Sequence, residues 1–116
     1  MIEDILRNTG LLYHQGSSPA HLPPETFVCW FDNILLDGPD RVLLSGENSI
    51  PCIYRHDIRL EVYEPQEDPT AEMAIESQII AKGLSFSKYD REWLRSVQRY
   101  LVTYELSYMT KSTRRN

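Results

Sequence analysis

The sequence contains no apolar run long enough to cross a bilayer, and it does not begin like a secreted protein. Its first ten residues, MIEDILRNTG, carry acids where a signal peptide carries basic residues before an apolar stretch. We therefore expect no membrane segment and no membrane partner, and a protein that stays in the cytoplasm where it is made.

An excess of positive charge is also missing. Lys and Arg number 12 and Asp and Glu number 17, which gives a formal net charge of -5. General affinity for nucleic acid depends on many cationic contacts to phosphates, so this balance argues against DNA or RNA as a ligand. The local exception is the end of the chain, TKSTRRN, and we interpret residues 111–116 as a flexible basic tail.

Cysteines and closely spaced metal ligands are scarce. Structural zinc sites use pairs such as C-x-x-C or H-x(3-5)-H, and the sequence has no such pair. His14 and His21 stand on either side of a loop, while Cys29 and Cys52 each have apolar neighbours. We expect no metal site, and two reduced thiols in the core.

Sequence signatures of catalysis are lacking as well. There is no G-x-S-x-G turn, and the five glycines are scattered, so no loop can cradle a phosphate. Acids crowd together at Glu61, Glu64, Glu67 and Asp68, but they fall at a strand end and a helix start. There they favour the helix dipole and solvate a loop. The sequence predicts no catalytic or cofactor-binding residue, no cofactor and no enzymatic activity.

What the sequence does contain is an ordinary globular composition, with 41% hydrophobic and 25% charged residues. Its length suits one core, so we expect a single domain over residues 1–110. Apolar residues at helical spacing within 2–8, followed by Gly10, predict a short N-terminal helix. The apolar and aromatic run TFVCWFDN predicts a strand covered on both faces, either by its own domain or on one side by a partner.

Alternation of apolar and charged residues is clearest in YRHDIRLEV, residues 54–62. Its even-numbered positions form one side, and the exposed side is expected to consist of Arg55, Asp57, Arg59 and Glu61. Residues 99–109, RYLVTYELSYM, have the same period. We expect these two strands to pair through aromatic and β-branched neighbours.

Turn-forming residues separate two further candidate strands. Residues 37–40 predict a turn, and residues 46–49 predict a hairpin between RVLLS and IPCIY. Pro51 lacks a backbone N–H, so the second of these strands must begin as an edge or a bulge.

Start and stop signals frame a helix over about 69–82. Asp68 can cap its start, and Gly83 follows its end. One stripe of this helix, which suits the domain's own sheet, consists of Ala71, Ile75 and Ile79. Met73 and Ile80 lie on a different side, so either loops cover them or they contact another subunit.

Residues 85–98, SFSKYDREWLRSVQ, follow neither period. We expect a strand-like start, a turn near Asp90 and a lead into the final strand. The sum is an α+β fold with an antiparallel or mixed sheet of four to five strands, on which the N-terminal helix and the second helix pack.

The order of these parts carries a resemblance. A short N-terminal helix is followed by LPPETFVCWFDN, by YRHDIRLEVYEPQEDPTAEMAIESQIIAKGLSFSKYDREWL and by VQRYLVTYELSY. Over nearly the whole chain this order resembles the tail terminator, or tail completion, proteins encoded by tailed phages and prophages. Members of that family typically show a strand leading into a short acidic loop, an acid-rich helix and a final aromatic strand.

The resemblance implies a structural virion protein. Such α+β proteins form a ring, commonly a hexamer, at the head-proximal end of the tail tube, where the ring ends tube growth and offers a head-tail joining surface. The implied partners are further copies of the chain, the major tail tube protein and the head-tail connector protein, with DNA passing through the lumen without specific binding. A lumen of negative charge would not retain phosphates. The implied location is the virion tail, and the host cytoplasm during assembly.

Candidate subunit or partner contacts are Trp30, Met73, Ile80, Trp93 and His56. For Trp30 the alternative is a plain core residue. His56 shares the apolar side of its strand, so a core or subunit contact comes before catalysis.

Three other functions stay open. One is a neck or connector adaptor that binds the portal side of the same assembly. A second, of another class, is a small cytosolic ligand-binding or enzymatic domain that uses His56, Asp57 and nearby acids. A third is a regulatory partner-binding module of a host bacterium.

Overall fold

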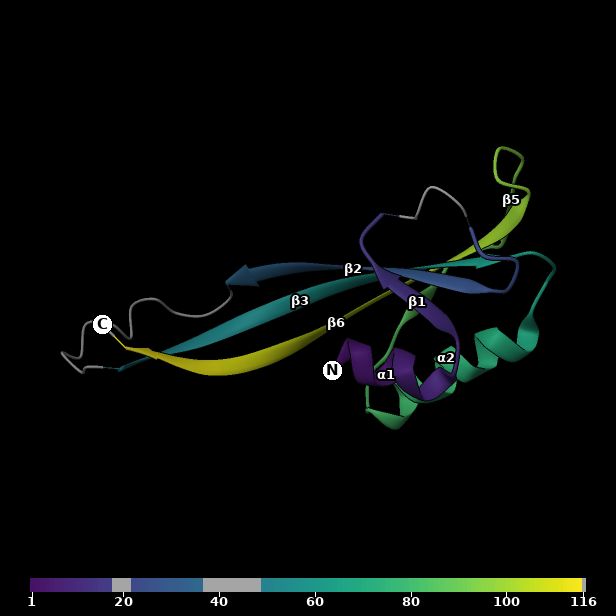
Figure 1. The fold of residues 1–116 in the computed structure, drawn as a ribbon. Helices are drawn as coiled ribbons and strands as arrows, with labels where there is room; N and C mark the ends of the chain where they lie inside the picture. Colours follow the sequence, from purple (N-terminus) through teal and green to yellow (C-terminus); the bar gives the residue numbers. More distant parts are fainter. Residues whose placement is uncertain (18–21, 37–48, 116) are drawn as a thin grey trace.

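Two helices lie on one face of a mixed sheet of six strands (Figure 1) in a computed structural model that describes residues 1–17, 22–36 and 49–115. In chain order the elements are α1 (Ile2–Thr9), β1 (Leu12–Gln15), β2 (Phe27–Leu36), β3 (Ser49–Glu64), α2 (Pro69–Ala81), β4 (Ser87–Lys88), β5 (Glu92–Leu94) and β6 (Arg99–Arg115). Across the sheet the strands run in the order β1-β2-β3-β6-β4, and β5 also pairs with β6. The predicted α+β fold is confirmed.

The sheet has six strands where four to five were expected. The irregular segment before β6 supplies two short ones, β4 and β5, which both pair with β6. The turn lies at residues 95–98, between β5 and β6, and not near Asp90 as predicted. Strands of two and three residues are too short to show a period in the sequence. β1 is parallel to β2, while the other pairs are antiparallel.

The register of β3 and β6 decides which side chains are buried. The two strands are antiparallel, with Leu60 opposite Tyr104 and Val62 opposite Val102. These four side chains are at most 1% exposed and face the helices, as the alternation predicted. The odd-numbered residues of β3 point to the other face, which carries no described helix.

Both helices bury the stripes that their sequences predict. α1 buries Ile2, Ile5 and Leu6 and ends at Gly10, whose φ of 76° is the left-handed conformation that glycine favours. α2 begins at its cap Asp68 and buries Ala71, Ile75 and Ile79, together with Glu72. The main core therefore lies between α1, α2 and the inner half of the sheet.

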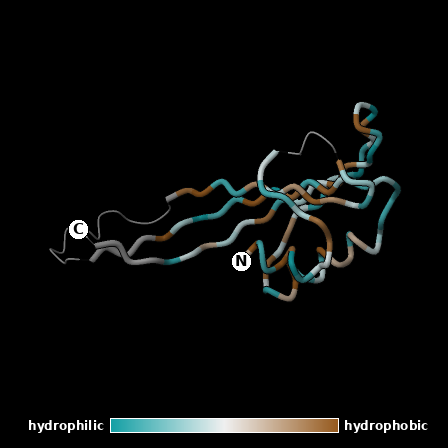
Figure 2. Tube along the Cα trace, in the orientation of Figure 1, coloured by the Kyte–Doolittle hydropathy of each residue, from teal (hydrophilic) through white to brown (hydrophobic). Residues whose placement is uncertain are grey.

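The sheet is longer than the helical layer that covers it. The molecule measures 57 × 29 × 22 Å, and its outer half consists of strands alone (Figure 1). We call this half the arm, and it comprises residues 33–36 of β2, 49–57 of β3 and 107–115 of β6. Hydrophobic residues continue along β2 into the arm (Figure 2), so its surface is not uniformly polar.

The expected C-terminal tail is replaced by strand. The backbone of 111–115 continues β6 and pairs with 49–53 of β3, so the described sheet extends to Arg115. Basic residues do not prevent this pairing, because charged side chains are well tolerated on edge strands. The predicted turn at 37–40 and the predicted strand at 41–45 lie outside the described residues.

Pro51 occupies a position in the sheet that tolerates its missing backbone N–H. Pro51 precedes Tyr54, where the pairing of β3 with β2 begins, so its described pairing is with β6 alone.

Cys29 is a buried free thiol opposite Glu61. Cys52 is nine residues, or about 30 Å, along β3 from that point, so a disulfide between the two is excluded.

Neither described helix has the length and apolar character needed to span a membrane.

The cap of α2 gives a test of the fold. Asp68 accepts the backbone N–H of Ala71 at 3.1 Å and the hydroxyl of Thr26 at 2.6 Å. Asp68→Ala is expected to lower the free energy of unfolding by about 1–2 kcal/mol, because it leaves the first turn of the helix uncapped. Urea denaturation followed by circular dichroism measures the change. The exposed neighbour Glu25 is the control, and an equal loss in Glu25→Ala would contradict the capping role.

Candidate functional site

Arg91, in the segment before β5, lies among three acids from the end of β3 and the start of α2. Its Nε donates to Glu64 at 3.3 Å and its Nη1 to Glu67 at 3.4 Å, while its Nη2 donates to Glu72. The Glu64 side chain is fully buried and the Glu72 side chain is 5% exposed. One guanidinium thus bonds to two buried carboxyl groups from different elements.

A second cation extends this arrangement along α2. Lys88 of β4 donates to Glu72 at 2.9 Å and to Glu76 at 2.8 Å. The Tyr104 hydroxyl of β6 donates to Glu76 at 2.6 Å. We call Glu64, Glu72, Glu76, Lys88 and Arg91 the acid cluster, and it ties α2 to β3, β4 and β6.

The two buried carboxylates of the cluster have opposite pKa shifts. Burial raises the pKa of Glu64 to about 8, and the neighbouring Glu72 adds to this while Arg91 opposes it. Burial alone would raise the pKa of Glu72 too, but hydrogen bonds with Glu64, Lys88 and Arg91 outweigh it and lower the pKa to about 2. Glu64 therefore holds a proton at neutral pH beside an ionised Glu72.

Carboxylates with separated pKa values are the raw material of acid–base catalysis, but this pair is engaged internally. The hollow beside it has a volume of about 190 Å³ and is lined by Glu72, Lys88, Tyr89, Asp90, Arg91 and Val102. Ligand pockets usually measure about 300–1,000 Å³. The geometry is better suited to holding the β4–β5 segment against α2 than to binding a substrate.

Glu64 corrects one sequence prediction. It was expected to solvate the loop before α2, yet it ends β3 and is buried. The sequence did carry a signal for this burial, because Glu64 is two residues after Val62 and so continues the buried side of the strand. Arg91 was not singled out from the sequence, because its acids are 19 to 27 residues away. Asp68 does cap α2, as predicted.

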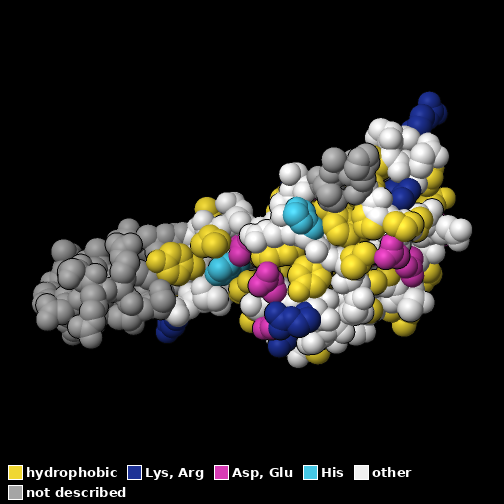
Figure 3. Space-filling model, in the orientation of Figure 1, with side chains coloured by type: hydrophobic (Ala, Val, Ile, Leu, Met, Phe, Trp, Pro, Cys, Tyr) yellow, Lys and Arg dark blue, Asp and Glu magenta, His cyan; other side chains and the backbone are white. Residues whose placement is uncertain are grey.

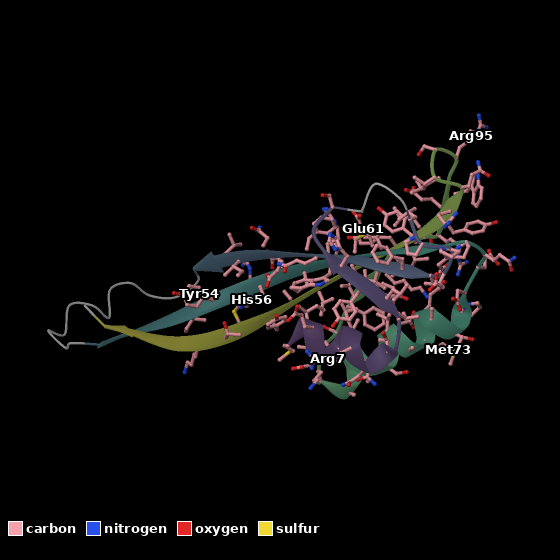
Figure 4. The ribbon with its side chains drawn as sticks, in the orientation of Figure 1. Arg7, Tyr54, His56, Glu61, Met73 and Arg95 are labelled. Atoms are coloured by element: carbon pink, nitrogen blue, oxygen red, sulfur yellow. The ribbon has the colours of Figure 1, made fainter. Side chains whose placement is uncertain are left out.

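His56 lies at the base of the arm, on the helix side of the sheet. Its Nδ1 is 2.9 Å from a carboxylate oxygen of Asp32, its Nε2 is 3.0 Å from the Thr110 hydroxyl, and its ring stacks on Tyr108 at 4.7 Å. In the tautomer with the ring proton on Nδ1, that nitrogen donates to Asp32 and Nε2 accepts from the Thr110 hydroxyl. The expected position on the apolar side of β3 is confirmed (Figure 4).

This carboxylate–imidazole–hydroxyl series resembles a nucleophile relay in its order of groups. A relay also needs donors for an oxyanion and a place for the substrate. A hollow of about 530 Å³ opens on the opposite face and is lined in part by Phe31, Asp57 and Arg59. The His56 series therefore serves first as a link across three strands, β2, β3 and β6.

The opposite face of the sheet is the charged face that alternation predicted. Arg59 lies 4.5 Å over the Phe31 ring and 3.2 Å from Glu61, and Arg55 lies 3.2 Å from Asp57. These pairs are partly exposed, so each contributes little to stability. Cys29, also on this face, is buried, and burial raises its pKa to about 11, which keeps the thiol unreactive.

The predicted contact residues do not form one site. Trp30 is 6% exposed and belongs to the core, which is the alternative foreseen for it. Met73, on the side of α2 away from the sheet (Figure 4), is 65% exposed, and Ile80, seven residues or about two turns further along, is 63% exposed. Trp93 of β5 is 47% exposed and packs edge-on against Tyr100.

The arm adds an apolar surface that the sequence did not indicate. Ile34 and Met109 are each more than half exposed, and Leu35 is also exposed; Ile34 lies on the helix side of the arm, and Leu35 and Met109 lie on the opposite face. Figure 3 shows hydrophobic side chains extending past the helical layer onto the arm. Ile34 and Leu35 continue the apolar run of β2 beyond the stretch TFVCWFDN, which is the signal that was available.

Comparison with known proteins adds no assignment: no protein-family model matches the chain, and no curated protein matches it. Within residues 1–17, 22–36 and 49–115, no group of three or more His, Cys, Asp or Glu side chains can hold a metal ion. The function has to be inferred from the surfaces described above.

Removing Arg91, one of the two cations of the acid cluster, tests how much the cluster contributes to stability. Arg91→Met is expected to lower the free energy of unfolding by about 3 kcal/mol, because it leaves two buried acids without their shared guanidinium. Chemical denaturation measures the loss. The matched control is Arg95→Met, an exposed arginine on the turn after β5 (Figure 4), which is expected to change stability by less than about 0.5 kcal/mol. Equal effects would contradict the role of Arg91.

The raised pKa of Glu64 predicts a pH dependence. Between the ordinary value of 4.5 and about 8, the folded protein holds a proton that the unfolded chain has released. Stability from this group is therefore greatest below about pH 4.5 and falls as pH rises to about 8. Glu64→Gln removes this dependence. The thermal midpoint of the variant should therefore rise relative to that of wild type as the pH increases from about 5 to about 9. If the curves of thermal midpoint against pH for Glu64→Gln and wild type ran parallel, this role of Glu64 would be excluded. Glu67→Gln, at an exposed position, is the control and should give a curve parallel to that of wild type.

Proposed function

We propose that this protein is a structural subunit of a phage or prophage tail, which assembles head to tail into a closed ring that caps the tail tube. The ring would end tube growth and present a surface to the head-tail connector. In this proposal the chain acts through its shape and its contacts, and its polar clusters maintain that shape.

The observation that carries the proposal is the placement of exposed apolar side chains. Among them, Met73 and Ile80 lie on the outer side of α2, and Ile34 lies on the helix side of the arm, in a separate place. Two different surfaces on one chain favour a heterologous contact, in which each subunit uses one surface for each neighbour. Such a contact yields a ring when the rotation between subunits closes.

The polar groups are consistent with this assembly role. The acid cluster fixes α2 against the sheet, and the His56 series fixes the base of the arm, so both apolar surfaces stand on supported elements. Rigid surfaces lose less conformational entropy on association than flexible ones do. A neck adaptor that binds the portal side would use the same features, and the tube protein distinguishes the two.

A second candidate, a small catalytic or ligand-binding domain, is favoured by one observation: the Asp32–His56–Thr110 series. It requires that His56→Ala abolish a turnover or binding event and leave assembly intact. In the assembly proposal the same variant only weakens the base of the arm. Hydrolysis of activated esters by wild type and variant, measured beside light scattering, separates the two.

The assembly proposal is tested by multi-angle light scattering of the purified protein, with and without the tail tube protein. We expect a discrete oligomer, alone or once tube protein is added, and tubes of shortened length in electron micrographs when the protein is present during tube assembly. A strict monomer that leaves tube length unchanged would overturn the proposal. Binding to a portal-side connector without an effect on tubes would instead support the neck adaptor.

A further inference from the structure

The chain between Phe86 and β5 crosses the acid cluster as a short strap. We give this name to residues 87–91, which comprise β4 and the three residues after it. None of the five side chains is buried, and only Arg91 is partly covered. β4 adds two paired residues to the sheet, and the backbone N–H of Tyr89 donates to the carbonyl of Thr103 at 2.9 Å. Apolar burial therefore contributes little to holding the strap in place.

Charge supplies most of the remaining contacts of the strap. Both cations of the acid cluster, Lys88 and Arg91, belong to it, and they bond to carboxyl groups of β3 and α2. A hollow of about 190 Å³ is lined by residues 88–91 together with Glu72 and Val102. The strap is therefore not packed closely along its length, and solvent has room to move in beside the cluster.

Beneath the strap, Glu64 is a buried carboxyl whose two oxygens differ. Arg91 donates to Oε1 at 3.3 Å, while Oε2 is buried and receives no hydrogen bond from the described residues. The cluster consists of three acids and two cations, so ionisation of Glu64 gives it an excess of negative charge. An ionised oxygen without a donor is costly to bury, whereas a proton on Glu64 can be shared with the neighbouring Glu72. Closure of the strap therefore favours the protonated form of Glu64.

We infer that residues 87–91 open as a unit while the core stays folded, and that Glu64 makes this opening depend on pH. Both ends of the strap are held separately, by Phe86, which packs edge-on against Tyr104, and by the pairing of β5 with β6. Opening lets solvent reach Glu64 and releases the edge of β6 at residues 103–105. It takes place within one chain and does not depend on the proposed ring.

The direction of the pH dependence follows from the two environments of Glu64. With the strap closed, burial raises the pKa of Glu64 to about 8, and contact with solvent in the open form returns the pKa toward its ordinary value of 4.5. Below about pH 4.5 both forms hold the proton, and the closed form is favoured most. Between the two values only the closed form holds it, so opening becomes easier as the pH rises from about 5 to about 8.

Charged and titratable groups face Glu64 from every element around it. They are Glu67 of the loop, Glu72 and Glu76 of α2, Lys88 and Arg91 of the strap, and Tyr104 of β6. Glu72 stays ionised, because its hydrogen bonds outweigh burial and lower its pKa to about 2. Burial and a hydrogen bond to an acid raise the pKa of Tyr104. Burial alone would lower the pKa of Lys88, but bonds to acids raise it, and bonds to acids also raise that of Arg91. These four groups keep their charge between pH 5 and pH 8.

Native-state hydrogen exchange, followed by NMR in low concentrations of urea, tests whether the strap opens separately. The reporter of the strap is the Tyr89 N–H, and the reporter of the core is the N–H of Ile79 in α2. We expect a protection factor for Tyr89 about 100-fold or more below that of Ile79, and nearly independent of urea, since little surface is exposed by local opening. Equal protection and equal urea dependence of the two amides would mean that the strap opens only when the whole chain unfolds, which overturns the inference.

Two pairs of variants test what holds the strap. From pH 5 to pH 8 the Tyr89 protection factor should fall about tenfold or more in wild type and in the exposed control Glu67→Gln, but less than about twofold in Glu64→Gln. The same fall in Glu64→Gln would overturn the role of Glu64. Lys88→Met should lower Tyr89 protection about tenfold at constant pH, and the exposed control Lys82→Met should leave it unchanged. No effect of Lys88→Met would overturn a strap held by charge.

Discussion

The pairing of β3 with β6 is the constraint on which the rest of the structure depends. All 16 residues of β3 have partners in β6, and the inner residues also have partners in β2. Because side chains alternate, this one register sends Leu60 and Tyr104 toward the helices and Arg59 and Glu105 away from them. A slip by one residue would turn charged side chains toward α1 and α2. The positions of the acid cluster, of His56 and of the arm all follow from the same register.

Much of the fold was predictable because local patterns agree with the global arrangement. The strict alternation in 54–62 and 99–109 identified the central strands and their faces, and Asp68 marked the start of α2. Prediction failed where a side chain's fate depends on a distant partner. Glu64 was assigned to solvent on its chemical type, since nothing near it in the sequence shows that Arg91 will bond to it in the interior. Burial of an acid is a tertiary property.

The extent of each layer was equally hidden from the sequence. Alternation says which side of a strand is apolar, but it does not say where the covering helices end, so the arm could not be foreseen. The same limit explains the two tryptophans. Trp30 lies in the covered half of β2 and is core, the alternative foreseen for it, while Trp93 lies on the short β5 and is half exposed. Residue type alone therefore did not predict the burial of either tryptophan, because burial depends on whether a second layer covers that part of the sheet.

The order of the strands in the sheet also has a consequence for how the chain reaches its native state. β3 lies between β2, which precedes it, and β6, which is the last element of the chain. The contacts of its second edge must wait for residues 99–115, and closing such long loops makes folding slow relative to helical proteins of this size. During synthesis, β3 therefore emerges with one edge unpaired and without Val102 and Tyr104 to cover its apolar side. The core can therefore close only after residues 99–115 are available to pair with β3.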